Sequence, residues 1–192
     1  LRELNRYQRC GALILLDLDS FNYVNDTLGH HIGDRLLQNV ARRFGQMLRD
    51  TDTLARLGGD EFVAILTELK SDTDLEAIAA HLLDSLRQPY RIEALELHTS
   101  PSIGISLYEH DGTDIDTLIR RADTAMYHAK NLGRNNYKYY SEEIRTNGAR
   151  IFALEQRLRR SLHEEDFELV YQPIIEMQDG KWNLIGTHAS GS

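Results

Sequence analysis

A short apolar run that ends in acidic residues places the strongest constraint on the fold of this chain. The run from Ala12 to Leu16 leads directly into Asp17-Leu18-Asp19. Consecutive apolar residues without polar alternation are typical of a strand buried on both faces, which requires packing layers on either side of a sheet. The run is also far shorter than the ~20 apolar residues of a transmembrane helix. We therefore expect a domain built around one buried strand, with carboxylates at its end.

Apolar residues recur at helical spacing in three later segments. We expect helices over Gly33–Arg49, Asp72–Leu86 and Asp116–Lys130. Either Thr113 or Asp114 would cap the third helix, and Gly133 would end it.

Extended patterns lie between these predicted helices. Gly58-Gly59-Asp60-Glu61 stands between Arg56-Leu57 and Phe62–Leu66, which predicts a hairpin with its turn at the glycines. Further strands are expected at Tyr90–Ile92, His98–Tyr108 and Tyr137–Tyr140. Pro101 indicates an irregular or edge position for the second of these. This order of elements predicts an α+β domain in which helices flank a central, mainly antiparallel sheet.

The first predicted domain ends at about residue 140, and a polar segment follows it. We expect a first domain over residues 1–140, a polar linker over 141–149, an unfinished second unit over 150–186 and a tail without structural signal over 187–192. The second unit would contain a helix at Arg150–His163, a strand at Phe167–Gln172 and a hairpin at Ile174–Ile185, interrupted by Asp179-Gly180.

The charge balance limits the ligands that the chain can bind. Its 192 residues include 22 Lys and Arg against 30 Asp and Glu, a formal net charge of −8. This balance excludes broad electrostatic binding of DNA, so an anionic ligand must be held by a few placed cations or by a metal. The single cysteine, Cys10, excludes an internal disulfide and fits a reducing compartment. No signal peptide pattern is present, and we expect a cytoplasmic chain, whose intact form could be anchored through regions upstream.

Asp17 and Asp60 are the candidates for a metal site. Strand ends place side chains at the rim of a sheet, so these two carboxylates would face each other if the first strand and the hairpin are neighbours. Mg²⁺ prefers carboxylate oxygens together with substrate phosphates, and such a pair suits metal-assisted phosphoryl transfer. Gly58-Gly59 would let a phosphate or base approach closely. Taken alone, a Gly-Gly-Asp turn is usually an ordinary hairpin turn, and an Asp at a strand end is usually a solvated cap.

Four motifs together resemble the GGDEF family of diguanylate cyclases. They are DLDSFNYVNDTLGHHIGD at Asp17–Asp34, RLGGDEF at Arg56–Phe62, SIGIS at Ser102–Ser106 and ADTAMYHAKNLGRN at Ala122–Asn135. The resemblance covers about residues 1 to 140 and implies a fold similar to class III nucleotidyl cyclases and polymerase palms. It also implies that two GTP molecules condense to cyclic di-GMP and pyrophosphate within a face-to-face homodimer.

The resemblance implies a role for each residue at the motif positions. Asp17, Asp60 and the backbone carbonyl of Leu18 would bind Mg²⁺, with Mn²⁺ as the alternative, because both ions accept oxygen ligands. Asp60 would also be the general base or its organiser, and Glu61 would be a further metal or polar contact. The backbone at Gly58 and Gly59 would lie against the substrate.

Further positions would bind the nucleotide and the product. Asn25 and Asp34 would recognise the guanine edge, with His30 near the same substrate. Lys130 and Arg134 would hold the triphosphate from one face of a helix end, where such cations also commonly complement the helix dipole. Arg49 and Asp52 match an RxxD motif that would bind cyclic di-GMP as an inhibitor, although their spacing also suits a weak local ion pair.

The sequence departs from the family pattern in three places. Asn22 stands where the family generally has a lysine, which implies a slow cyclase or, as the alternative, a regulatory module that binds GTP or cyclic di-GMP for an attached phosphodiesterase. The family's opening segment, DxLTGLxNR, is absent. Residues 150–186 resemble the start of an EAL phosphodiesterase domain, but His188-Ala-Ser190 stands where its metal-binding glutamate should follow. We therefore expect no phosphodiesterase activity, foreign residues at 187–192, a sensory module upstream and a complete EAL domain downstream in the intact protein.

Overall fold

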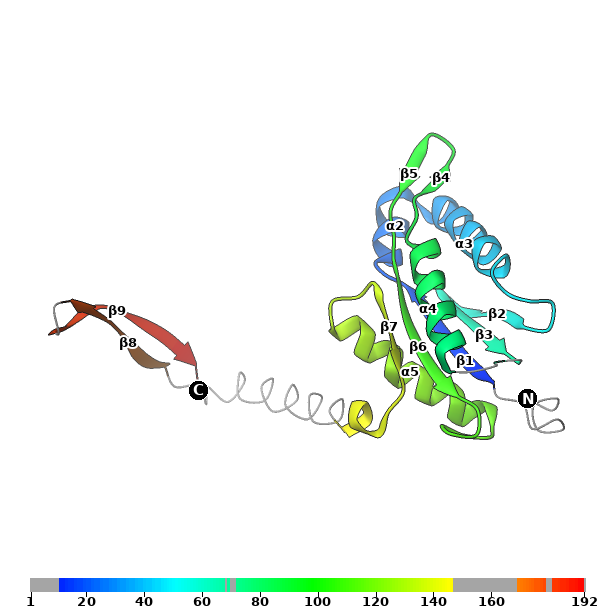
Figure 1. Ribbon diagram of the computed structural model, residues 1–192. Coiled ribbons are helices and arrows are strands. Elements are labelled where there is room, and N and C mark those ends of the chain that lie inside the picture. Colours follow the sequence, from blue (N-terminus) through cyan, green and yellow to red (C-terminus); the bar gives the residue numbers. More distant parts are fainter. Residues whose placement is uncertain (1–10, 68, 70–71, 147–168, 179–180, 192) are drawn as a thin grey trace. The chain divides into compact units, whose positions relative to one another are not determined.

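β1 (Ala12–Leu18) is buried at every residue and forms the centre of a five-stranded sheet (Figure 1). The other strands are β2 (Thr53–Gly58), β3 (Glu61–Leu66), β6 (Pro101–Leu107) and β7 (Asn136–Tyr139). They lie in the order β2-β3-β1-β6-β7. This computed structural model describes residues 11–67, 69, 72–146, 169–178 and 181–191.

The sheet is mainly antiparallel, as the sequence predicts. β1 pairs antiparallel with both β3 and β6, and β2 and β3 form the predicted hairpin. Only the β6–β7 pair of this sheet is parallel, with Ser102 opposite Asn136. Because β3 is a direct neighbour of β1, the turn of the hairpin lies beside the acidic end of β1.

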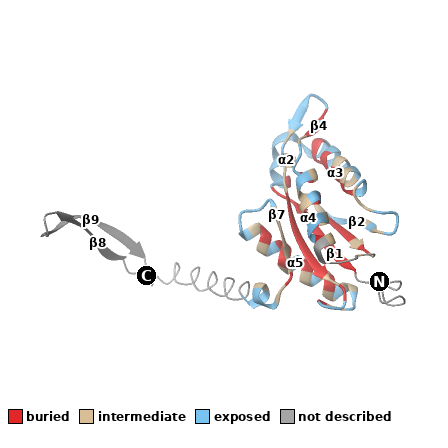
Figure 2. Ribbon diagram, viewed as in Figure 1, coloured by how far each residue is buried: buried red, intermediate tan, exposed pale blue. Residues whose placement is uncertain are grey.

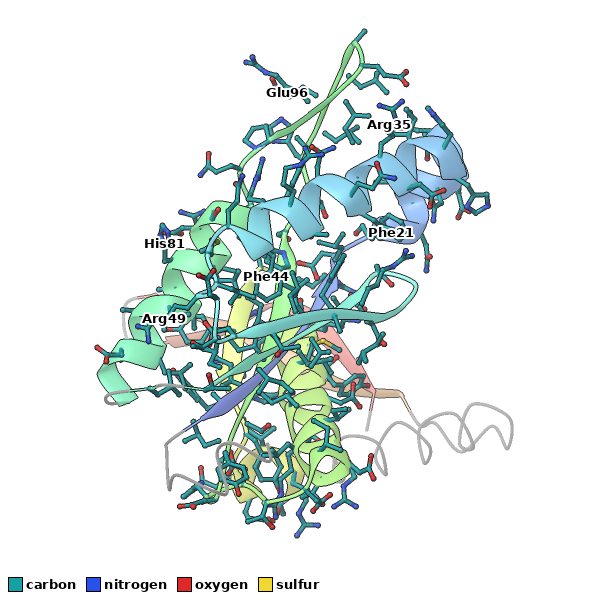
Figure 3. The ribbon with its side chains drawn as sticks, turned by 90° about the vertical axis from the view of Figure 1, so that its right-hand side faces the viewer. Phe21, Arg35, Phe44, Arg49, His81 and Glu96 are labelled. Atoms are coloured by element: carbon teal, nitrogen blue, oxygen red, sulfur yellow. The ribbon has the colours of Figure 1, made fainter. Side chains whose placement is uncertain are left out.

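Helices cover both faces of the sheet. They are α2 (Phe21–Leu28), α3 (His30–Gly45), α4 (Asp72–Leu86) and α5 (Ile115–Asn131). Alternate residues of β1 divide between the two layers: Ile14 and Leu16 pack with residues of α3 and α4, whereas Leu13 and Leu15 pack with residues of α5. Phe44 points from α3 toward the sheet, on the side opposite α5 (Figure 3). Figure 2 shows the buried residues concentrated along the central strands and the helix sides that face them.

Gly104 allows α5 to lie directly on the sheet. It stands in β6, and a Cβ at this position would overlap the backbone of Ala122 and Met126 in α5. Asp114 caps the helix, since its carboxylate accepts a hydrogen bond from the Thr117 N–H at 2.8 Å. The predicted helix is therefore confirmed, and Asp114 is the one of the two candidate residues that caps it. Its close packing on the sheet depends on the absence of a side chain at Gly104.

Several predicted boundaries differ from the observed ones. The helix expected at Gly33–Arg49 is α3, which starts three residues earlier and ends at Gly45. Met47 and Leu48 still pack against the core from the following turn, which explains why their spacing looked helical. α2 was not predicted, although Phe21, Val24 and Leu28 recur at helical spacing, because the helix has only eight residues and Phe21 alone is buried.

Of the irregular or edge position expected at Pro101, the edge alternative is wrong for the strand as a whole, although Pro101 itself lies beyond the pairing with β7, which begins at Ser102. β6 lies between β1 and β7, and Pro101 is its first residue, paired with Leu18. The first position of a strand tolerates a residue without an N–H donor. The strand expected from His98 starts only at Pro101. β5 (Leu95–Leu97), which was not predicted, forms a separate hairpin with β4 (Tyr90–Ile92).

The chain divides into two compact units, Leu1–Gly148 and Ala149–Ser192. In the second unit, β8 (Leu169–Gln178) and β9 (Lys181–Gly191) form the antiparallel pair that the hairpin pattern predicts. β9 includes Thr187–Gly191, which pair with the first half of β8 although the sequence there carries no structural signal. The helix expected at Arg150–His163 lies outside the described residues. Among the residues that are described, no helix is long and apolar enough to cross a bilayer.

Candidate functional site

The carboxyl end of β1 and the hairpin turn meet at one hollow of about 290 Å³. Asp17 and Asp60 line this hollow together with Lys130 and Arg134. The register explains the meeting, because Asp17 pairs with Glu61, the residue after Asp60. Two acidic motifs more than forty positions apart in the sequence are thus brought to the same edge of the sheet. Its remaining lining residues are Leu18, Asp19, Ser20, Phe21 and Asn22.

Asp17 carries a negative charge in an unfavourable environment. Burial raises the pKa of its carboxyl group, and the nearby charges of Asp60 and Glu61 raise this pKa further. Lys130 opposes the shift, because its Nζ lies 2.7 Å from Asp17 Oδ2. The net shift is upward, so the contact with Lys130 does not fully offset burial and the two neighbouring carboxylates.

The turn that presents Asp60 is held in place by Arg56. The Nε and Nη2 atoms of Arg56 donate hydrogen bonds to the Gly59 carbonyl at 2.9 and 2.6 Å. Gly59 has φ of +53°, a left-handed conformation that glycine adopts at little cost. A Cβ at Gly59 would meet no neighbouring atom, so the left-handed backbone conformation, and not crowding, explains the glycine. The glycine also leaves open space beside the turn.

The donor set of the hollow fits a hard divalent ion. Asp17, Asp60 and the backbone carbonyl of Leu18 offer only oxygen ligands, and Mg²⁺ commonly uses one or two carboxylates with water and phosphate oxygens for the remaining positions. In the described part of the chain, no group of three or more His, Cys, Asp or Glu side chains is arranged to hold a metal. A divalent ion at this edge would therefore depend on a ligand's phosphates to complete its coordination.

The three residues expected near a guanine base lie on α2 and α3. Asn25 sits against Gly33, where a Cβ would overlap the Asn25 side chain. His30 is the exposed first residue of α3, and Asp34 is exposed one residue after Gly33. Asp34 lines a second hollow of about 510 Å³. Its other lining residues are Leu37, Gln38, Ala41, Leu54, Ala55, Arg56 and Phe62.

This second hollow combines an apolar wall with a carboxylate. A flat heterocycle could pack on the apolar side chains while Asp34 accepts hydrogen bonds from its N–H groups. Arg56 lines the same hollow and also holds the Gly59 turn, so the two hollows flank one hairpin.

The two cations expected to share a helical face are arranged differently. Lys130 lies in the last turn of α5, but Arg134 follows the helix in a turn and has φ of +62°. Helical spacing therefore does not bring them together. They line the same hollow because the chain reverses after Gly133 and returns toward β1.

Arg49 and Asp52 lie in the turn between α3 and β2, on another side of the domain. The Asp52 carboxylate accepts hydrogen bonds from the backbone N–H groups of Arg49 and Thr67, at 3.0 and 3.2 Å. Arg49 is labelled in Figure 3 beyond the end of α3. Both residues line a small hollow of about 150 Å³ with Met47, Leu48, Leu66, Leu69 and Ile78. Asp52 thus organises the turn, which is more than the weak side-chain pair that the spacing alone suggests.

Sequence reasoning assigned no role to Asp19 or to the Arg56 side chain. Asp19 was visible as part of an acidic cluster, but nothing in the sequence shows that Ser100, Ser102 and the Asn135 N–H surround it. Arg56 lies within the RLGGDEF motif, yet its contact to Gly59 depends on the β-bulge between Arg56 and Gly58.

Comparison with known proteins identifies the family of this fold. Residues 1–136 match the family model described as "Diguanylate cyclase, GGDEF domain". The chain is 42% identical over 184 residues to the bifunctional diguanylate cyclase/cyclic di-GMP phosphodiesterase MucR of Pseudomonas aeruginosa, and 36% identical over 170 residues to the cyclic di-GMP phosphodiesterase NbdA of the same organism. These alignments cover 96% and 88% of the chain but only 26% and 22% of the relatives.

Solved structures show the same fold. The X-ray structure of an EAL/GGDEF domain protein from M. capsulatus matches with a TM-score of 0.67 and 44% identity. The match covers 71% of this chain and 88% of that one. The predicted α+β class and the resemblance that the motifs carry are both confirmed by these comparisons.

Proposed function

The chain belongs to the GGDEF family of diguanylate cyclases, and we propose that it condenses two GTP molecules to cyclic di-GMP and pyrophosphate. One observation carries the proposal: Asp17, Asp60, Lys130 and Arg134 line a single hollow. Two carboxylates for a divalent ion and two cations for phosphates are the parts that phosphoryl transfer needs.

In this proposal each chain binds one GTP. Asn25 and Asp34 hold the guanine edge with His30 nearby, and the apolar wall of the larger hollow accepts the base. Lys130 and Arg134 neutralise the triphosphate, and the backbone at Gly58 and Gly59 lets it approach the turn. Asp17, Asp60 and the Leu18 carbonyl would hold Mg²⁺ or Mn²⁺, with Glu61 as a further contact. The bound ion would supply stabilisation of the charge that develops on the transferring phosphate.

The bond changes define what these residues must do. In each of two reciprocal steps, the 3′-oxygen of one nucleotide forms a bond to the α-phosphorus of the other, and the bond from that phosphorus to the pyrophosphate oxygen breaks. The first step gives a linear dinucleotide, the second closes the ring, and two pyrophosphates are released. The 3′-hydroxyl proton passes to Asp60 or to a water that Asp60 orients. Because one chain offers a single such hollow among its described residues, the two nucleotides would meet across a face-to-face homodimer.

Turnover of labelled GTP tests this proposal directly. With Mg²⁺ present, we expect the wild-type chain to release labelled cyclic di-GMP and the Asp60→Asn variant to release at least ~10²-fold less. Asp84→Asn makes the same chemical change on the exposed side of α4 and serves as the matched control, with unchanged turnover. An Asp60→Asn variant as active as the wild type would contradict the assigned role.

A second candidate function is a regulatory module that binds GTP or cyclic di-GMP without turnover. Asn22 favours this candidate, because it lines the hollow where an amide supplies no positive charge. The name of NbdA describes only a phosphodiesterase, and a GGDEF unit in such a protein could serve regulation. Calorimetric binding of GTP without cyclic di-GMP formation would identify the module, whereas release of product would identify the enzyme.

We further propose the domain organisation of the longer protein. A GGDEF domain over residues 1–140 and a linker over 141–149 would precede the start of an EAL domain at 150–186. The M. capsulatus protein, whose name contains both EAL and GGDEF, supports the pairing of these two domains. A longer form that contains the whole EAL domain would hydrolyse cyclic di-GMP, and the 192-residue chain would not.

A further inference from the structure

We propose that Asp19 is a positioning residue: it fixes the turn that carries Arg134 and so directs this cation at the phosphates of the bound nucleotide. The inference rests on the proposed nucleotide site. It adds a residue that binds no substrate itself but determines where a substrate-binding residue stands.

The carboxylate of Asp19 joins three segments of the chain. Its Oδ1 accepts a hydrogen bond from Ser102 Oγ at 2.7 Å. Its Oδ2 accepts hydrogen bonds from Ser100 Oγ at 2.5 Å and from the Asn135 N–H at 3.1 Å. Asp19 itself is only 8% exposed. The residue therefore links the end of β1 to the start of β6 and to the turn after α5.

The turn after α5 has a backbone conformation that requires support. Gly133, Arg134 and Asn135 have φ of +102°, +62° and +48° in succession. Left-handed conformations are unfavourable for residues with a Cβ, and they persist where surrounding contacts fix them. The bond from Asn135 N–H to Asp19 is such a contact, and it comes from outside the turn.

Both peptide groups of Arg134 are also fixed. Its N–H donates to the Ala129 carbonyl at 3.2 Å, and its own carbonyl accepts from Asn136 Nδ2 at 2.7 Å. With the next N–H held by Asp19, the Cα–Cβ direction of Arg134 is determined before any ligand binds. The long side chain therefore begins from a fixed point at the rim of the hollow that Asp17 and Asp60 line.

The acceptor atoms of Asp19, and not its charge, are what this role requires. A negative charge near the triphosphate would by itself weaken nucleotide binding. In Asp19→Asn, the amide oxygen can take the Oδ2 position and still accept from the Asn135 N–H, while the amide nitrogen donates to the Ser102 hydroxyl. In Asp19→Ala, all three hydrogen bonds are lost. The two variants thus separate the role of the hydrogen bonds from the role of the charge.

Amide hydrogen exchange on the full chain without nucleotide tests the structural half of the proposal. We expect exchange at Asn135 to be at least ~10-fold faster in Asp19→Ala than in the wild type, because a hydrogen-bonded amide becomes free. Asp19→Asn should retain most of the protection. Equal protection at Asn135 in the wild type and in Asp19→Ala would overturn the proposal. So would equally fast exchange in both variants, because the lost charge and not the lost acceptor would then explain it.

Calorimetric titration with GTP and Mg²⁺ tests the functional half through a double-mutant cycle. We expect Asp19→Ala and Arg134→Ala each to raise the Kd for GTP roughly 10-fold, and the double variant to raise it no further. Asp19→Asn should bind GTP as the wild type does. Additive losses in the double variant would overturn the inference, because Asp19 would then act independently of Arg134. A wild-type chain that binds no GTP would overturn the proposed function, whereas the exchange result would still show whether Asp19 holds the turn.

Discussion

At the scale of single residues, Asn22 decides how fast the proposed reaction can run. It lies at the rim of the same hollow as Asp17 and Asp60, where the family generally has a lysine. An amide can donate a hydrogen bond but brings no charge to the transferring phosphate. Loss of one preorganised donor of this kind costs about 2–4 kcal/mol of transition-state stabilisation, so we expect slow turnover of GTP at the proposed site.

We predict that Asn22→Lys raises the turnover of GTP by roughly 10²–10³, because it restores a cation beside the reacting phosphate. Initial rates of cyclic di-GMP formation with saturating GTP and Mg²⁺ would measure this gain. Asn22→Gln is the matched control, since it lengthens the side chain but keeps an uncharged amide, and it should give no comparable gain. If the lysine variant were no faster than a measurable wild type, Asn22 would not limit the reaction.

At the scale of helices and strands, elements that depend on local sequence patterns can be predicted from the sequence, whereas contacts between distant segments cannot. The buried strand, the Gly-Gly hairpin and α4 follow from residues close together in the chain, and they were predicted with few errors. The network around Asp19 and the reversal that brings Arg134 back toward β1 were not predictable, because their partners lie on other elements. The family motifs located the site, whereas the pairing of β1 with β3 explains why it assembles.

Gly104→Ala should destabilise the domain by about 1–3 kcal/mol, because a Cβ at this position would overlap the backbone of α5. Urea unfolding followed by circular dichroism would measure the loss. Gly45→Ala is the control: a Cβ there lies 3.8 Å from Leu54, in ordinary contact, and the free energy of unfolding should stay equal or rise by about 0.4–1 kcal/mol. A Gly104→Ala variant as stable as the wild type would show that the close packing of α5 on β6 is not required.

We expect Tyr90, which joins α3, α4 and β4, to make the stability of the domain depend on pH in the alkaline range. Its hydroxyl donates to the Leu86 carbonyl at 2.8 Å, and Arg43 lies 3.8 Å from the centre of its ring. Burial raises the pKa of Tyr90 from 10.0 to about 12, even though the Arg43 charge lowers it. Between these values the unfolded chain has lost a proton that the folded chain retains, so the free energy of unfolding falls as pH rises.

We predict that Tyr90→Phe reduces this fall between pH 10 and about 12, since the variant has no phenol to ionise. At neutral pH the same variant should lose about 1 kcal/mol, because the hydrogen bond to Leu86 is gone. Urea unfolding of both proteins across this pH range would separate the two effects. Parallel stability curves for variant and wild type over the alkaline range would contradict the assignment.

At the scale of the whole molecule, the Arg49–Asp52 turn is a candidate route for feedback by the product. The turn is remote in the fold from the hollow at the end of β1, and its small hollow has its own lining residues. Asp52 organises the backbone through the N–H groups of Arg49 and Thr67, so replacing Asp52 would disturb the turn itself. Arg49→Ala keeps the backbone N–H and is the cleaner variant.

We predict that added cyclic di-GMP slows GTP turnover by the wild type, and that Arg49→Ala raises the inhibitory concentration roughly tenfold or more. The uninhibited rate should stay the same, because Arg49 contacts neither proposed nucleotide hollow. Arg42→Ala, an exposed change one turn before the end of α3, is the control and should leave inhibition intact. Equal inhibition of the Arg49 variant and the wild type would remove product binding from this turn.

The proposed site requires Asp17 and Asp60, which are distant in the chain, to hold one divalent ion together over a guanine nucleotide. A crystal structure of the chain with Mg²⁺ and a nonhydrolysable GTP analogue tests it most directly. We predict density for one ion bound by both carboxylates and by phosphate oxygens of the analogue, with the base beside Asn25 and Asp34. An ion coordinated without either carboxylate, or an analogue bound away from this edge of the sheet, would contradict the account.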